Sequence, residues 1–320
     1  APLPAGHRDP AGGAVGTRPD CSGQGCVVIA VVGATGFVGR HLVARLASSG
    51  VSVRAVARKP AANAPGVDAV SADLLQPESL QTAFRGVDTV VHCAAITADR
   101  KEAYPGQYRR VNGEGTRNLV AAARLGGVKR IVLVNGLGTR PGKDGSYMRT
   151  RWEMAESVRS SGLAWVALQP SILFGDGAPF PAAMARLARQ LPVMPVLGGG
   201  RKLQPLWVED LVTCLVQCSA DPRWDGRAID LGGPEQMTFA QIDDLILATI
   251  KVRRLKLPLP LSVARIQARI FSLLPNPPLV PATLELFEFD NTTDLDAVSR
   301  TFGFQPHGIR EHFEHHGLDG

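Results

Sequence analysis

A six-residue aliphatic run followed by three spaced glycines is the feature that most constrains the fold of this chain. The run from Val27 to Val32 predicts a buried strand, and Gly33, Gly36 and Gly39 open the helix that follows. The first glycine allows a tight turn, the second lets the main chain approach a pyrophosphate, and the third lets the helix pack on the strand. Free N–H groups at the helix N-terminus then bind the phosphates. Although the chain contains 34 glycines, this strand, turn and helix context predicts dinucleotide binding over an ordinary glycine turn.

Strands and helices alternate through the first half of the chain. Further strands are predicted at 51–57, 68–72, 87–94, 129–134 and 163–168, with helices at 108–124 and 147–161 between them. The apolar run 87–94 is typical of a parallel strand that is covered on both faces. The spacing therefore predicts an α/β fold with a doubly wound parallel sheet.

The pattern loosens after Pro170, where glycine and proline interrupt shorter elements. A short strand at 228–231 is expected to return to the sheet, so the second lobe is interleaved with the first. We expect an extended arm at 1–25, a Rossmann domain at 26–175 and a smaller α/β lobe at 176–320. The arm is rich in Pro, Gly, Ala and Arg and is interpreted either as the remainder of a targeting peptide or as an expression artefact.

Composition excludes several classes of protein. No run of 18 apolar residues occurs in the 320-residue chain, so no helix is expected to span a membrane. The net charge of +6 permits an acidic partner such as nucleic acid or anionic lipid, but dispersed surface arginines explain it better. The five scattered cysteines indicate a reduced compartment without a disulfide framework or a metal site. His312, His315 and His316 are not spaced as metal ligands and are expected to be solvated.

The residues after the second and third predicted strands indicate which dinucleotide is bound. Arg58 and Lys59 stand where a NAD-specific site normally holds an acid that binds the ribose diol, so they favour NADP(H) through its 2′-phosphate. The alternative is a pair of solvated loop charges. Asp73 is expected to accept from the adenine amino group or to cap the next helix. The small side chains of Ala94 and Ala95 leave room for the nicotinamide ribose.

Motifs along residues 27–306 resemble the extended and atypical short-chain dehydrogenase/reductase superfamily. They are GATGFVG at 33–39, the Asp73-Leu74 pair, VVHCAA at 90–95, VNGEGTRNL at 111–119 and QPSILFG at 169–175, with a helix that opens at Tyr147. The resemblance implies a bound dinucleotide and carries a set of cofactor-binding positions: Gly33, Thr35, Gly36, Phe37, Val38, Gly39, Arg58, Lys59, Asp73, Leu74, Ala94, Ala95, Asn112, Tyr147, Arg151 and Pro170.

Active members of the superfamily use a Ser or Thr together with Tyr and Lys spaced as YxxxK. The cation lowers the pKa of the tyrosine, which is about 10 when free, so that it can pass a proton near neutral pH. Here Tyr147 is present, but Arg151 replaces the lysine and Asn135 falls at the Ser/Thr position. Arg151 is still cationic, whereas Asn135 cannot share a proton in a relay. Thr139 is a candidate replacement hydroxyl. The resemblance therefore implies nucleotide binding with degraded hydride-transfer machinery.

Within the superfamily the chain looks most like the Rossmann-type accessory subunits of respiratory complex I (NADH:ubiquinone oxidoreductase alpha-subcomplex subunit nine) and their bacterial relatives. The segments that suggest this are SGLAWVALQPSILFGDG, LQPLWVEDL, AIDLGGPEQMTF, and LLPNPPL followed by EFDN. This resemblance implies a non-catalytic NADP(H)-holding subunit that contacts other complex I subunits near the junction of the membrane and peripheral arms. The implied location is the matrix side of the mitochondrial inner membrane, or the cytoplasm or membrane periphery of a bacterium.

The sequence leaves two other functions open. One is an atypical reductase, or a nucleotide-sugar epimerase or dehydratase, that uses Tyr147 and Arg151. The other is RNA binding through the basic surface. Because the sequence lacks basic residues interleaved with aromatic ones, no nucleic-acid partner is expected.

A basic amphipathic segment lies at 262–274. On a helix, Val263, Ile266, Ile270, Leu273 and Leu274 share one stripe, with Arg265 and Arg269 beside it. Such a helix can lie on anionic lipid or dock on a membrane subunit. The alternative is that the stripe packs on the second lobe.

Overall fold

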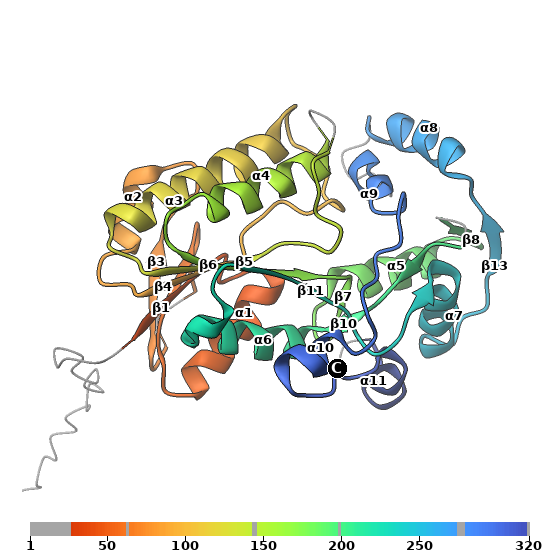
Figure 1. The fold of residues 1–320 in the computed structure, drawn as a ribbon. Helices are drawn as coiled ribbons and strands as arrows, with labels where there is room; N and C mark the ends of the chain where they lie inside the picture. The colour runs from red at the N-terminus through yellow and green to blue at the C-terminus, as the bar shows by residue number, and fades with distance from the viewer. Residues whose placement is uncertain (1–26, 62–63, 143–145, 198–199, 274–278, 319–320) are drawn as a thin grey trace, which may run out of the picture.

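A seven-stranded parallel sheet forms the centre of the protein (Figure 1). The structure, a computed structural model, describes residues 27–61, 64–142, 146–197, 200–273 and 279–318, so the arm expected at 1–25 lies outside the described residues. The strands in spatial order are β11 (Arg227–Leu231), β6 (Ala164–Pro170), β5 (Arg130–Val134), β4 (Thr89–His92), β1 (Val28–Val32), β2 (Ser52–Ala57) and β3 (Val67–Ser71). The predicted doubly wound parallel sheet is confirmed, as is the return of 228–231 beside β6.

The order of the strands reverses direction at β1, which lies between β2 and β4. Parallel α/β sheets bind their ligands at such a switch point, beyond the carboxyl ends of the strands. In the register, Val32 lies opposite Val56 on one side and His92 on the other. The glycine turn that follows Val32 therefore begins at the sheet position where a ligand is expected.

Helices cover both faces of the sheet, because successive residues of a buried strand point to opposite faces. Ile29 and Val31 pack with α1 (Phe37–Ser48), α6 (Val208–Ala220) and α10 (Ala297–Phe302). Ala30 and Val32 pack with α2 (Pro77–Ala83), α3 (Gly115–Leu125) and α4 (Tyr147–Arg159). Figure 1 shows these two helical layers above and below the sheet.

The predicted helix at 108–124 contains a π-helical segment. Residues Arg109–Glu114 are π-helical, and α3 continues from them. Single-turn π-helical segments are frequent at functional sites. This one places Asn112, which is fully buried, beneath the loop that follows β4.

The second lobe packs against the carboxyl ends of β6 and β11. It contains helices α5 (Pro179–Gln190), α7 (Phe239–Thr249), α8 (Leu261–Phe271), α9 (Pro281–Glu285) and α11 (Ile309–His316). The short helix at Pro222–Trp224 before β11 packs with the sheet instead. Three two-stranded pairs join the loops of the lobe: β10 (Leu206–Trp207) with β7 (Leu173–Phe174), β12 (Met237–Thr238) with β9 (Lys202–Leu203), and β13 (Leu255–Pro258) with β8 (Val193–Val196). No helix in the described ranges is long and apolar enough to cross a bilayer.

One surface expectation is wrong, and one of the two alternatives for 262–274 is not observed. His312 is buried, because its ring packs 5.2 Å from that of Phe174, whereas His315 and His316 are exposed as expected. The stripe of α8 does not pack on the lobe. Instead the small residues Ala264 and Ala268 face inward, which leaves Val263, Ile266, Ile270 and Leu273 exposed. Leu274 lies outside the described residues.

Candidate dinucleotide site

The turn between β1 and α1 has the conformation that the glycine spacing predicts. Gly33 has a φ of +87°, and its N–H donates to the carbonyl of Val56 at 2.9 Å. A β-carbon placed on Gly33 would lie 2.8 Å from the main-chain nitrogen of Ala94. Both sterics and backbone angle therefore require glycine here. The contact joins the β1 turn to the end of β4 at the switch point.

The N-terminus of α1 is open. Gly36 is its N-cap, no side chain caps it, and no acidic residue occupies its first turn. Thr35 and Gly36 are exposed. Since the first N–H groups of a helix have no intrahelical partner, this end can receive an anion. Phe37 and Val38 begin the helix and are half-buried, which places their N–H groups at the same end.

Gly39 sets the distance between helix and strand. A β-carbon placed on it would lie 2.1 Å from the carbonyl oxygen of Gly33, which is closer than any van der Waals contact. By contrast, a β-carbon on Gly36 would meet only the oxygen of Gly33, at 3.1 Å. Gly39 is therefore needed for packing, while the space over Gly36 fits the close approach of a pyrophosphate.

The candidate cofactor discriminators lie at the carboxyl ends of β2 and β3. Arg58 and Lys59 follow β2 directly and are exposed. The hydrogen bond from Gly33 to Val56 places the glycine turn beside this end of β2. Asp73 accepts from the N–H of Leu75 at 2.9 Å through Oδ1, so it forms a local turn before α2 and is not its N-cap.

The loop after β4 is fixed from below by Asn112. Its side chain accepts from the N–H of Ile96 at 2.8 Å and donates to the carbonyl of Ile96 at 3.0 Å. Ala94 and Ala95, half-buried, therefore lie on an anchored segment. Asn112 therefore positions the loop, since the oxygen and the nitrogen of its side-chain amide both bond to the main chain of Ile96. Leu74 is buried in the same layer, where its carbonyl accepts from Asn118 at 2.9 Å.

Tyr147 and Arg151 lie one turn apart at the start of α4, and both are buried. A β-carbon on Gly136 would lie 3.5 Å from Nη2 of Arg151, so the guanidinium passes the end of β5. Asn135 is buried as well, and its side-chain nitrogen donates to the carbonyl of Arg151 at 3.2 Å. Thr139 donates to the carbonyl of Gly136 at 2.6 Å. The structure thus gathers Asn135, Tyr147 and Arg151, but it commits Asn135 and Thr139 to main-chain acceptors.

His92 at the end of β4 is an uncharged neighbour of this group. Its Nε2 lies 3.0 Å from Oγ1 of Thr116, whose hydroxyl donates to the carbonyl of Asn112 at 2.6 Å. Nε2 must therefore donate to Thr116, because the single hydroxyl proton is already used. Burial, with a smaller effect from the positive charge of Arg151, lowers the pKa of His92 to about 3. His92 consequently remains neutral at physiological pH.

The second lobe covers the tyrosine end of the site. Glu285, at the end of α9, accepts from the N–H of Tyr147 at 3.1 Å and from the N–H of Met148 at 3.0 Å. Thr283 of the same helix donates to the carbonyl of Ala98 at 2.8 Å. An apolar cluster fills the junction, in which Tyr108 meets Tyr147 edge to face at 5.4 Å. The two lobes therefore meet at Tyr147.

Phe289 extends this cover toward β5. A β-carbon on Gly138 would lie 2.2 Å from the ring of Phe289, and the guanidinium of Arg140 lies 4.1 Å from the ring centre. Sequence reasoning missed Glu285 and Phe289. Only the EFDN segment, noted for its resemblance, pointed to this region, and it gave no indication of the contact.

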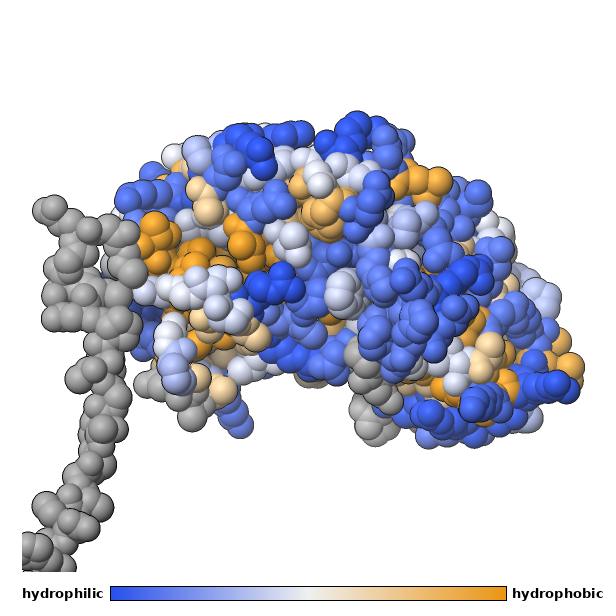
Figure 2. Space-filling view, turned by 90° about the horizontal axis from the view of Figure 1, so that it is seen from below, coloured by the Kyte–Doolittle hydropathy of each residue, from blue (hydrophilic) through white to orange (hydrophobic). Residues whose placement is uncertain are grey.

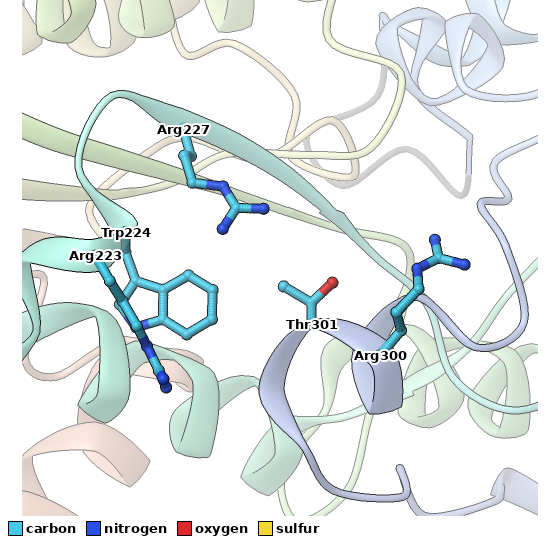
Figure 3. Close-up of a pocket in the computed structure, with 5 residues that line it drawn as sticks. All are labelled: Arg223, Trp224, Arg227, Arg300 and Thr301. Atoms are coloured by element: carbon cyan, nitrogen blue, oxygen red, sulfur yellow. The ribbon is translucent and has the colours of Figure 1, made fainter.

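One surface pocket lies away from the site. Arg223, Trp224, Arg227, Arg300 and Thr301 line a space of about 380 Å³ (Figure 3). Arg227 is the first residue of β11, so the pocket lies at the amino end of the sheet, opposite the glycine turn. Two of its arginines already form ion pairs with aspartates. Arg223 lies 2.9 Å from Asp221, and Arg300 lies 3.0 Å from Asp294.

The cysteines and histidines of the described chain do not form a metal centre. Cys93, Cys214 and Cys218 are free thiols, and burial raises the pKa of Cys93 to about 12. Across the described ranges, no three His, Cys, Asp or Glu side chains are arranged to hold a metal ion.

The fold and the open helix N-terminus define a Rossmann-type dinucleotide-binding protein. Residues 33–186 match the NAD(P)H-binding family. The solved structure of MoeE5 in complex with UDP-glucose and NAD superimposes with a TM-score of 0.67 at 21% identity, and the match covers 89% of this chain and 95% of that one. Residues 33–186 are therefore similar to NAD(P)H-binding domains, and the overall fold is the one seen in the MoeE5 structure.

Two curated relatives show the range of proteins with similar sequences. The ceramide reductase of Caulobacter vibrioides is 31% identical over 199 residues, which cover 61% of this chain and 62% of that protein. The match thus spans less than two thirds of that relative. The mitochondrial NADH dehydrogenase (ubiquinone) 1 alpha subcomplex subunit 9 of Arabidopsis thaliana is 25% identical over 316 residues, which cover 92% of this chain and 77% of that protein.

Proposed function

We propose that this chain holds NADP(H) as a structural ligand and does not turn it over. The contrast between the two ends of the site supports the proposal. At the phosphate end, Gly36 is exposed at an uncapped helix terminus. At the chemical end, Tyr147 is only 7% exposed and lies beneath α9. The site is thus accessible where a cofactor is held and covered where a substrate would have to approach.

The altered catalytic positions support the same proposal. Arg151 supplies a cation in place of lysine, but its planar group is larger and passes along Gly136. Asn135 donates to the main chain of α4 and has no hydroxyl to relay a proton. Bound nucleotide then acts as a folding ligand, because a ligand held only by the folded state stabilises it with rising concentration.

We further propose that the chain is an accessory subunit of a respiratory complex I, peripheral to the membrane. The Arabidopsis complex I subunit is the relative that supports this, since its match extends over both lobes. The implied partners are complex I subunits near the junction of the membrane and peripheral arms.

The second candidate function is an NAD(P)H-dependent reductase or nucleotide-sugar epimerase. Tyr147 and Arg151 favour it, because they are buried together one turn apart on α4. The named activity of the Caulobacter relative is also a reduction. In this function Tyr147 would pass the proton, and Arg151 would be the cation one turn away on the same helix.

Native mass spectrometry of the purified chain, combined with a turnover screen, separates the two. The structural function predicts retained NADP(H), together with no nicotinamide absorbance change over a panel of carbonyl substrates and nucleotide sugars. Turnover that Tyr147→Phe abolishes would establish the enzyme instead. Copurification with large respiratory assemblies tests the complex I proposal separately, since a free monomer with bound nucleotide would contradict only that part.

A further inference from the structure

The face of α8 that points away from the protein is apolar. Val263, Ile266 and Ile270 recur at helical spacing and are 42%, 59% and 59% exposed, and Leu273 just beyond the helix is 85% exposed. On a helix of 3.6 residues per turn these four positions fall within one narrow arc, opposite Ala264 and Ala268. Because those two alanines pack on the lobe, the stripe is left largely exposed.

The strand that precedes α8 in the chain also exposes apolar side chains. Leu255 and Leu257 of β13 are 74% and 59% exposed. Together with the stripe they make six of the eleven large hydrophobic side chains that are exposed in the described chain. Figure 1 places β13 and α8 at the same end of the molecule, and Figure 2 shows orange and blue side chains mixed at that end. Such concentration marks an interaction surface, since scattered single residues are the usual pattern.

The positive charge of this region favours a negatively charged partner. Between Lys251 and Ser272 the sequence contains six Lys or Arg and no Asp or Glu. Lys256 is paired with Asp244 at 2.6 Å and Arg265 with Glu288 at 2.6 Å. Arg253 and Arg269 are exposed and have no acidic partner within the described ranges. An apolar stripe flanked by unpaired cations is the pattern of helices that lie in the interface of an anionic membrane.

We propose that α8 and β13 form a membrane-docking surface for bilayers that contain anionic lipid. The apolar stripe enters the acyl boundary, and Arg253 and Arg269 meet lipid phosphates. Helix α8 lies parallel to the bilayer, because its 11 residues are too few to span it. The inference depends neither on the nucleotide nor on turnover, so it holds for either function proposed above.

Vesicle flotation with the full chain tests the proposal. Binding is expected to vesicles of phosphatidylcholine and phosphatidylglycerol mixed at about two to one, and to be weak with phosphatidylcholine alone. The double variant Ile266→Asp with Ile270→Asp should lower the bound fraction at least about tenfold. The matched control is Leu125→Asp with Leu295→Asp, since these residues are 74% and 54% exposed elsewhere. The control variant should bind like the wild type.

A charge variant and a folding measurement complete the test. Arg253→Glu with Arg269→Glu should weaken binding to the anionic vesicles and leave the residual binding to phosphatidylcholine unchanged. Circular dichroism should show unaltered folding in every variant, because all these side chains are exposed. Vesicle binding that survives the Ile266 and Ile270 substitutions would overturn the proposal. A concentration-dependent dimer that those substitutions abolish, with no vesicle binding, would assign the face to a second copy and overturn it equally.

Discussion

Glu285 and Tyr147 join the two lobes through a hydrogen bond of 3.1 Å from the N–H of Tyr147 to Oε1 of Glu285. A second hydrogen bond, from Met148 to the other oxygen, completes a carboxylate cap at the N-terminus of α4. A negative charge at this end also interacts favourably with the helix dipole. The position of the tyrosine therefore depends on a residue of the C-terminal lobe.

Removing this cap should destabilise the protein. Glu285→Ala leaves two N–H groups of α4 without their acceptors and should lower the free energy of unfolding by about 1–2 kcal/mol. Urea unfolding followed by circular dichroism measures the change. Glu288→Ala is the matched control, since Glu288 lies in the same segment but makes an exposed ion pair with Arg265, worth about 0–1 kcal/mol. Equal losses in both variants would contradict the cap.

Gly39→Ala should damage both packing and nucleotide binding. The added methyl group would lie 2.1 Å from the oxygen of Gly33, so α1 must move away from β1. We expect a loss of about 1–3 kcal/mol of stability or more, from overpacking, and loss of NADPH binding. Calorimetric titration and urea unfolding measure the two effects. Gly200→Ala is the control, because no atom lies within 4 Å of its added carbon; a well-tolerated Gly39→Ala would refute the packing role.

Arg58 and Lys59 should determine the preference for NADPH. Replacing both with Gln removes the two cations proposed for the 2′-phosphate. NADPH affinity should fall at least about tenfold, while NADH affinity changes by less than about threefold. Fluorescence titration of both nucleotides measures the ratio. Arg124→Gln, which alters an exposed cation on α3, should change neither affinity. Similar losses for NADPH and NADH in the double variant would show that the pair does not discriminate between them.

Asp243 should make stability depend on pH. The side chain is 1% exposed, and burial raises the pKa of its carboxyl from 3.8 to about 7. Between these values the unfolded chain releases the proton and the folded protein keeps it, so stability falls as pH rises. Above about pH 7 the full penalty applies, which is about 4 kcal/mol because each tenfold change in proton affinity is worth about 1.4 kcal/mol.

Asp243→Asn removes this penalty. The variant should be more stable than the wild type at pH 8, and the difference should shrink toward zero as pH falls to about 4. Urea midpoints measured across this range test the expectation. Asp244→Asn serves as control, since Asp244 is 60% exposed and its ion pair with Lys256 is worth about 0–1 kcal/mol. A stability difference independent of pH would show that Asp243 is ionised in the folded protein.

The sequence predicted those parts of the site that depend on local sterics. The requirement for glycine at Gly33 and Gly39 arises within one turn, and the alternating elements determined the parallel sheet. The cover over Tyr147 could not be predicted, because Glu285 is 138 residues away in the chain and carries no motif. The stripe of α8 was visible in the sequence. Whether the stripe faces the lobe or solvent depends on which residues pack inward. Only the tertiary structure shows that these are Ala264 and Ala268.

The place of β11 at the sheet edge has a consequence for biosynthesis. Its residues, 227–231, pair with β6 and are made long after the first strands leave the ribosome. Until then β6 has an unpaired backbone edge, with which strands of other chains can pair. We expect the growing polypeptide to need chaperone protection until β11 has paired with β6.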